Sequence, residues 1–443
     1  MSNQQFDDYE RDEELLEARR LKRLEMKRKR KIQQRIILAV FALILIVVIV
    51  LIVKGCSGEK EPAEPVSPEP VDIVETQEPP QVEPDTIATL AAVGDIMVYD
   101  DQLADAQQED LIYDFSDCFS VISAYTMSAD LTVGNLELNL SGAPYGGNAK
   151  TAPYFNAPEI LAANLKDIGF DILQTANTYS IMNGFNGLTN TINVLNEAGI
   201  DHVGTYASDP ASSPDGGVLV REVNGIKIAF IAFTKGLNGL SLPSGKEFSV
   251  DLLYTDYTAN YSSVNTTKIL DRIEAAKQQN PDIIIAMLHW GGEYDIEPVD
   301  TQTQIADLMF KNGVDVILGS HSHVVGPMQM KTVQTVDGET KDCFVAYSLG
   351  NFISSMTKEY TMESVILNLE FTKSGETGKT SISNVSYTPI YVVDHGEGSD
   401  VRFEVLPIRK AIESSIFADY SQQMSDAIEH LKTNTNSLYD SGN

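Results

Sequence analysis

The chain has 443 residues, of which 43% are hydrophobic, so it can form one large folded domain with additional segments and is not disordered throughout. Its formal net charge is −31, from 32 basic and 63 acidic residues. This balance argues against general binding to nucleic acid, because such binding depends on basic residues that neutralise phosphates. The three cysteines, Cys56, Cys118 and Cys343, are too few and too widely spaced to indicate a disulfide framework or a zinc finger.

The beginning of the chain predicts a single-pass membrane anchor. Residues 36–53 form an uncharged apolar run of 18 residues, which at about 1.5 Å per residue roughly spans the core of a bilayer. Residues 19–35 contain ten basic residues and one acidic residue, so the positive-inside rule places the charged segment 1–35 in the cytoplasm and the main domain outside the cell. A secretory signal peptide fits less well because its basic leader is shorter. Lipidation at Cys56 is a further alternative.

Residues 54–86 predict a disordered linker. Between residues 59 and 86 there are seven prolines, nine acidic residues and no aromatic residue, a composition typical of an extended, self-repelling spacer. After residue 35 the chain contains 21 basic and 55 acidic residues. We therefore expect the outer domain to repel anionic surfaces unless divalent cations intervene.

From residue 87 onward, apolar strands alternate with helices, which predicts an α/β fold with one domain at 87–395 and a helical tail at 396–443. The predicted strands lie at 87–93, 130–138, 171–175, 282–288, 314–318, 344–348, 364–371 and 387–393, the last interrupted by Pro389. The predicted helices lie at 117–128, 187–198, 268–279, 301–312 and 419–431. A hairpin at 218–234 is expected to turn at Asn224-Gly225.

Small residues followed by polar side chains come directly after several predicted strands. In α/β folds the carboxyl ends of strands carry the chemistry, so these side chains are candidates for a common site. The candidates are Asp95, Asn135, Glu137, Asn177, His289, His321 and His323.

Three of the six histidines belong to this set. In an extended segment His321 and His323 point to the same side, so the pair can bind one metal, or one metal and a substrate oxygen. Imidazole together with carboxylate and amide oxygens suits Mn, Fe or Zn.

Each candidate also has a structural alternative. Asp95 can cap a turn, Glu137 can be a surface carboxylate, and His289 can be a hydrogen-bonded core histidine. His202 and His395 lie outside the pattern, and His430 is expected to be solvated on the tail helix.

In their order along the chain, these motifs resemble those of the CapA family of bacterial capsule and poly-γ-glutamate biosynthesis proteins. The matching stretches include AAVGDIMVYD at 91–100, GNLELNLSG at 134–142, IAMLHWGGEY at 285–294, GVDVILGSHSHVVGPMQ at 313–329 and YSLGNFISS at 347–355. The family resembles a branch of the calcineurin-like metallophosphatases, which implies a four-layer α-β-β-α sandwich. By position, the resemblance implies one or two divalent ions (Mn, Fe or Zn) on Asp95, Asn135, Glu137, His289, His321 and His323. It further implies catalytic roles for His289, His321, His323 and Asn177.

The chain departs from the family pattern at two positions and from the pattern of many metallophosphatases at a third. Thr178 and Tyr179 stand where the family usually has Asn and His, and Met97 stands where many metallophosphatases have His. In such enzymes these positions supply a metal-bridging amide and a proton donor. Their replacement leaves the number of metals open, and with it whether any bond is broken. The unperturbed tyrosine pKa of about 10 makes Tyr179 a poor proton donor at neutral pH.

Three functions are therefore carried forward. The first is a membrane-anchored protein that acts outside the cell in the biosynthesis, export or attachment of poly-γ-glutamate or a related anionic capsule polymer, with other membrane capsule-synthesis subunits as partners. The second is an extracellular metal-dependent phosphoesterase of the metallophosphatase type, with a cell-envelope phosphoester as its substrate. The third is a non-catalytic scaffold that binds polymer through the same cleft.

Overall fold

The computed structural model describes residues 83–108, 112–147, 154–435 and 439–442. The predicted anchor at 36–53, the charged segment 1–35, the linker up to residue 82 and Cys56 lie outside the described residues. Among the residues that are described, no helix combines the length and the apolar character needed to cross a membrane.

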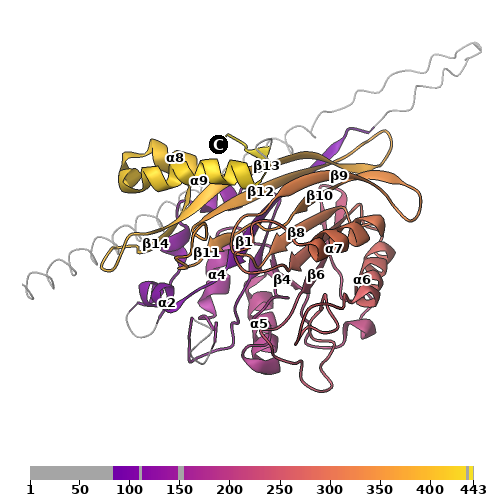
Figure 1. Cartoon of the computed structure of the whole chain (residues 1–443), viewed down its shortest axis with the longest axis horizontal. Coiled ribbons are helices and arrows are strands. Elements are labelled where there is room, and N and C mark those ends of the chain that lie inside the picture. The colour runs from indigo at the N-terminus through magenta and orange to yellow at the C-terminus, as the bar shows by residue number, and fades with distance from the viewer. Residues whose placement is uncertain (1–82, 109–111, 148–153, 436–438, 443) are drawn as a thin grey trace, which may run out of the picture. The chain divides into compact units, whose positions relative to one another are not determined.

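Two β-sheets form the centre of the fold (Figure 1). The order in the first sheet is β14 (Phe403–Pro407), β13 (Thr380–Asp394), β12 (Glu363–Lys373), β1 (Thr86–Ile96), β2 (Leu131–Leu136), β3 (Ile172–Gln174) and β4 (Asp201–Val203), with β11 (Asn351–Ile353) paired to the end of β1. The order in the second sheet is β5 (Leu219–Val223), β6 (Ile226–Thr234), β7 (Ile283–His289), β8 (Val316–Ser320), β10 (Thr340–Ala346) and β9 (Met328–Gln334). Strands β1 to β4 are mutually parallel, and so are β6, β7, β8 and β10.

Strand alternation explains how the two sheets pack. In β6, the side chains of Ile228 and Phe230 belong to the core between the sheets, whereas Ala229 and Ile231 belong to a second core on the outer face. Successive residues of a strand point to opposite faces, so an uninterrupted apolar run can bury both faces. The same division applies to β1, where Leu90 faces the central core and Ala91 faces outward.

Helices cover the outer faces of both sheets. On the first sheet lie α2 (Asp100–Ala106), η2 (Ser116–Phe119), α3 (Ser123–Thr126) and α4 (Ile160–Asp167), with α5 (Gly184–Ala198) packed beside α4 and β4. On the second sheet lie α6 (Thr266–Gln278) and α7 (Asp300–Lys311), and η3 (Pro210–Ser212) precedes β5. The mixed α/β sandwich expected from the sequence is confirmed. The long helix expected at 117–128 is instead two short turns, η2 and α3.

The C-terminal part of the chain packs onto the central core. After α8 (Ile408–Glu413) and η4 (Ser415–Tyr420), helix α9 (Ser421–Asn434) lies against β12 and β13 and buries Met424 and Leu431 (Figure 1). The expectation of a solvated His430 is wrong, because its ring stacks on Tyr360 at 3.5 Å and its Nδ1 contacts a carboxylate oxygen of Glu363.

Pro389 does not interrupt its strand. It pairs with Val365 inside the continuous strand β13, so the predicted break at this residue is wrong. Strand β14 pairs with β13 only from Ile390 onward, so at Pro389 strand β13 has β12 as its one partner in this sheet. A missing N–H group is tolerated at such a position. Cys118 and Cys343 are both buried and free.

Candidate metal centre

The seven candidate residues lie where the carboxyl ends of the parallel strands of both sheets meet. Asp95 and Asn135 belong to β1 and β2, Glu137 follows β2, and His289 ends β7. His321 and His323 follow β8, and Asn177 follows β3. None of the seven is more than 5% exposed, so Glu137 is not a surface carboxylate and every one of these polar groups must find a partner inside the protein.

A close approach between the backbones of Gly94 and Gly350 fixes the position of Asp95. A Cβ atom on Gly94 would lie 1.8 Å from the carbonyl oxygen of Gly350, so only glycine lets β1 pass this segment. The next residue, Asp95, donates its N–H to the same Gly350 oxygen at 2.9 Å. The contact orients the Asp95 side chain at the strand end.

The segment that carries His321 and His323 is not extended. Both residues have positive φ angles, 96° and 61°, which non-glycine residues rarely adopt. The N–H of His321 donates to Oδ2 of Asp95 at 3.3 Å. The expectation that the two residues lie in an extended segment and point to the same side, where they could bind one metal or one metal and a substrate oxygen, is therefore wrong in its premise.

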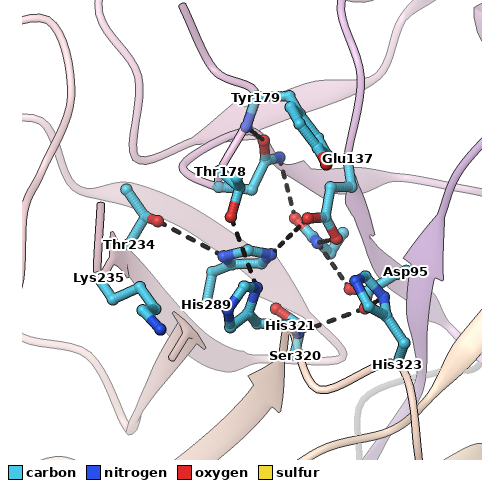
Figure 2. A network of polar contacts seen from close by, with 12 residues as sticks. Asp95, Glu137, Thr178, Tyr179, Thr234, Lys235, His289, Ser320, His321 and His323 are labelled. Atoms are coloured by element: carbon cyan, nitrogen blue, oxygen red, sulfur yellow. Dashed lines mark hydrogen bonds and ion pairs between the residues drawn. The ribbon is translucent and has the colours of Figure 1, made fainter. Parts of the chain in front are cut away.

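The ligand atoms form two groups that share one carboxylate (Figure 2). Glu137, His289 and His321 make up the first group, and Asp95, Glu137 and His323 make up the second. Within each group, one ligand atom per residue lies within 4.8 Å of the others. This arrangement suits two neighbouring cation positions with Glu137 between them.

The orientation of His289 fits a metal ligand. The Thr234 hydroxyl donates to the Gly236 carbonyl at 3.0 Å, so towards His289 its oxygen can act only as the acceptor of a hydrogen bond from Nδ1–H, at 3.5 Å. In that tautomer Nε2 presents a lone pair, and Nε2 lies 2.9 Å from Oε1 of Glu137 without a hydrogen bond. A buried nitrogen lone pair facing a carboxylate oxygen is the pattern that a bound cation satisfies.

The local electrostatics keep two imidazoles neutral, which is the form that binds metal. Burial lowers the pKa of His289 to about 3, and it lowers the pKa of His321 as well. The positive charge of Lys235 contributes to both shifts. Neither ring competes with a cation by holding a second proton at neutral pH.

The second group contains a charged pair. Nδ1 of His323 lies 3.1 Å from Oδ2 of Asp95 and 3.0 Å from Oδ1 of Asn351. Burial opposes ionisation of both groups, but this contact outweighs it, raising the pKa of His323 to about 9 and lowering that of Asp95. Burial and the charge of Asp95 raise the pKa of Glu137. Two carboxylates this close gain from a cation between them.

The two amides hold the carboxylates in place. Nδ2 of Asn135 donates to Oδ1 of Asp95 at 2.7 Å and lies 3.4 Å from Oε2 of Glu137. Asn177 lies behind Asn135 and donates to its Oδ1 at 3.2 Å and to the Leu136 carbonyl at 2.7 Å. The amide NH₂ of Asn177, which the resemblance assigns to catalysis, is thus committed to positioning Asn135.

The three departures seen in the sequence have different surroundings. The Thr178 hydroxyl lies 3.5 Å from Nδ1 of His321. The ring of Tyr179 stacks on Phe155 at 4.0 Å, and burial and the charge of Glu137 raise the pKa of its hydroxyl, so it stays protonated. Met97 is buried in the core on the outer face of the first sheet.

Three residues of this region were missed by sequence reasoning. Thr234 and Lys235 follow the pattern of polar residues at strand ends, since Thr234 ends β6 and pairs with His289 in β7. Asn351 begins β11 and accepts from His323. Their positions at strand ends were the available signal, but neither threonine nor lysine is a typical metal ligand.

The pattern of a protein family described as bacterial capsule synthesis protein PGA_cap matches residues 89–356. The chain is 27% identical over 307 residues to the PGA biosynthesis protein CapA of Bacillus subtilis (strain 168), covering 68% of this chain and 72% of the relative. It is 26% identical over 294 residues to the capsule biosynthesis protein CapA of Bacillus anthracis, covering 65% of this chain and 64%, less than two thirds, of that relative.

Two solved structures are similar in fold. One is a novel phosphatase from Mycoplasma pneumoniae, with a TM-score of 0.37 and 14% identity, covering 69% of this chain and 94% of that chain. The other is a putative 5'-nucleotidase from Staphylococcus aureus, with a TM-score of 0.40 and 14% identity, covering 77% of this chain and 58% of that chain. Both TM-scores lie below 0.5, so these similarities do not establish a shared function.

Proposed function

The chain belongs to the bacterial capsule synthesis family PGA_cap, and we propose that it acts on an anionic capsule polymer, with poly-γ-glutamate as the first candidate. Its role would lie in the synthesis, export or attachment of that polymer. The observation that carries the proposal is the pair of ligand groups that share the buried carboxylate of Glu137.

The donor set indicates the kind of ion. Imidazole nitrogens combined with carboxylate oxygens, and no thiolate, suit Mn, Fe or Zn. When bound, such an ion supplies concentrated positive charge that attracts and orients an anionic group. This matters because the chain is acidic overall, with a net charge of −31, and by itself repels a polyanion. Asp95, Glu137 and the three histidines would hold one ion for each ligand group, and His323 would release its second proton when its ion binds.

The proposal places the domain outside the cell. Residues 36–53 would cross the membrane once, with 1–35 in the cytoplasm and the acidic linker holding the folded domain at the outer side. Other membrane subunits of capsule synthesis are the proposed partners. Protease added to protoplasts should digest the part after residue 53 and spare a tag placed at the N-terminus. Digestion of the tag in sealed protoplasts would contradict this topology.

Binding of the polymer tests the proposal directly. Full-length protein loaded with Mn should bind a γ-linked glutamate oligomer, and a chelator or the variant Glu137→Ala should abolish the binding. The matched control is Asp337→Asn, an exposed carboxylate paired with Lys277 away from the centre, which should bind as the wild type does. Equal binding with and without chelator, or no binding by the wild type, would contradict the proposal.

A metal-dependent phosphoesterase is the second candidate. It is favoured by the convergence of three histidines and two carboxylates on one buried point, a donor set that can hold two ions on either side of a phosphoryl group. Mn-loaded protein should then hydrolyse a chromogenic phosphodiester, and His321→Ala should remove that activity. No turnover with Mn, Fe or Zn would exclude this candidate and favour a scaffold that binds polymer without cleaving it.

A further inference from the structure

We infer that Lys235 and Lys358 flank the metal centre and bind anionic oxygens of its ligand, whether these are carboxylates or phosphates. The inference rests on the proposed function in one respect: it names the groups that would select an anionic polymer at this site. Neither lysine belongs to the ligand groups described above.

The backbone holds Lys235 beside the centre. It follows Thr234 at the carboxyl end of β6, and its N–H donates to the carbonyl oxygen of His289 at 2.8 Å. Its ammonium group donates to the carbonyl of Gly291 and lies 4.7 Å from the centroid of the Tyr261 ring. Figure 2 shows the Lys235 side chain on the side of the network occupied by His289 and His321.

The ammonium group of Lys235 has donors to spare. A lysine ammonium carries three N–H bonds, and one is used by the Gly291 carbonyl. The side chain is half-buried, and within the described part of the chain its ammonium group contacts the Gly291 carbonyl and the Tyr261 ring but no carboxylate at ion-pair distance. Burial lowers the pKa of Lys235, and the charges of Glu293 and Asp295 partly oppose this shift without reaching ion-pair distance. A half-buried cation without a paired anion gains most from an anionic ligand.

Lys358 lies near His323 of the second ligand group. Its ammonium group is exposed and lies 4.6 Å from the centroid of the Tyr294 ring, and that ring lies 6.1 Å from the ring of His323. Thr361 ties this segment to the centre, because its hydroxyl donates to the Lys358 carbonyl at 2.7 Å and its carbonyl accepts from Asn351 at 3.2 Å.

A row of neighbouring rings connects the surroundings of the two lysines. The rings of His289 and His321 are 4.5 Å apart, those of His321 and His323 are 6.0 Å apart, and Tyr294 follows beside His323. Lys235 is thus associated with the His289 end and Lys358 with the Tyr294 end. Under this inference a ligand with repeated negative charges would contact both lysines at once, whereas a single phosphate held at the Lys235 side would leave Lys358 in solvent.

Two probes distinguish the sources of the anion. Full-length Mn-loaded protein is titrated with inorganic phosphate and, separately, with a γ-linked glutamate oligomer at fixed ionic strength, with metal content measured in parallel. We expect Lys235→Met to lower the affinity for both probes about tenfold or more, because a charge-assisted hydrogen bond is lost. Lys358→Met should lower the affinity for the oligomer only. Lys235→Arg keeps the charge, so its affinities should stay close to those of the wild type.

The control is Lys410→Met. The ammonium group of Lys410 also lies over a tyrosine ring, 5.8 Å from the centroid of Tyr125. Tyr125 belongs to α3, before the amino end of β2 and away from the centre. The variant Lys410→Met should therefore bind both probes like the wild type.

Three results would overturn the inference: unchanged binding of both probes by Lys235→Met, loss of metal from Lys235→Met, or no binding of either probe by the wild type. Phosphate binding that depends on Lys235, together with no oligomer binding, would support the role of Lys235 with phosphate as the anion. That result would contradict the polymer function proposed above.

Discussion

Nε2 of His289 and Oε1 of Glu137 lie 2.9 Å apart in the interior of the protein, with no hydrogen bond between them. The Thr234 hydroxyl accounts for this, because its oxygen accepts a hydrogen bond from Nδ1–H of His289 and so favours the tautomer whose proton lies on the opposite nitrogen. A lone pair is thereby directed at a carboxylate that also belongs to the second ligand group. The contact between these two residues links both proposed ion positions.

Thr234→Val should weaken metal binding although Thr234 is not a ligand. Valine keeps the shape but removes the oxygen that orients His289, and lost contacts of this kind typically cost about 10- to 100-fold in metal affinity. The measurement is competition for Mn against a fluorescent chelator. The control Thr205→Val removes another buried hydroxyl, which bonds to Thr175 at 2.6 Å, and should leave the affinity unchanged. An unchanged affinity in Thr234→Val would show that the hydroxyl does not orient the imidazole.

Gly94→Ala should destabilise the whole domain. The added methyl group would meet the Gly350 oxygen at 1.8 Å, and the backbone there cannot move away without breaking the contact that places Asp95. We expect a loss of about 3 kcal/mol or more in urea unfolding. Gly199→Ala is the comparison, because Gly199 ends α5 with a φ of 74° in open space and its replacement should cost about 1 kcal/mol. Equal effects of the two substitutions would contradict the steric explanation.

Glu363 and His430 predict a pH dependence of stability outside the metal centre. Burial, aided by the charge of Glu359, raises the pKa of Glu363 from 4.5 to about 8, and burial lowers that of His430 from 6.5. Below pH 6.5 the two groups act in opposite directions, because the unfolded chain releases a proton from Glu363 but takes one up on His430. Between pH 6.5 and about 8 only the folded protein keeps the Glu363 proton, so stability should fall as pH rises.

The expected slope is at most about 1.4 kcal/mol per pH unit, measured by urea unfolding in steps across that range. Glu363→Gln should flatten it, since glutamine keeps a neutral side chain at every pH. Glu429→Gln, on the exposed side of α9, should keep the wild-type slope. A slope that persists in Glu363→Gln would assign the titration to another group.

Local sequence patterns were sufficient for the α/β class and for the hairpin, whereas the sandwich was implied by the family resemblance. The apolar run of β7 predicted a strand buried on both faces, and Asn224-Gly225 does form the turn between β5 and β6, with φ angles of 52° and 77°. The edge strands β4, β9 and β14 were missed. In β9 most residues are at least partly exposed, so its sequence lacks the apolar pattern from which strands are recognised.

The arrangement of His321 and His323 could not be predicted from their spacing. It depends on Gly319, where a Cβ would lie 2.0 Å from the Tyr347 oxygen, and on the loop conformation that follows this contact. The assignment of the two rings to different ligand groups also depends on the packing of one sheet against the other, which brings Asp95 to His323 and Glu137 to His289. Contacts between residues this far apart in the chain leave no local pattern.

The central claim is that two ion positions share Glu137, and metal content by elemental analysis tests it most directly. After Mn loading and desalting, the wild type should hold one ion for each ligand group. His321→Ala should lose the ion of the first group, Asp95→Ala should lose that of the second, and Glu137→Ala should lose both. Wild-type metal content in Glu137→Ala, or no metal in the loaded wild type, would contradict the account.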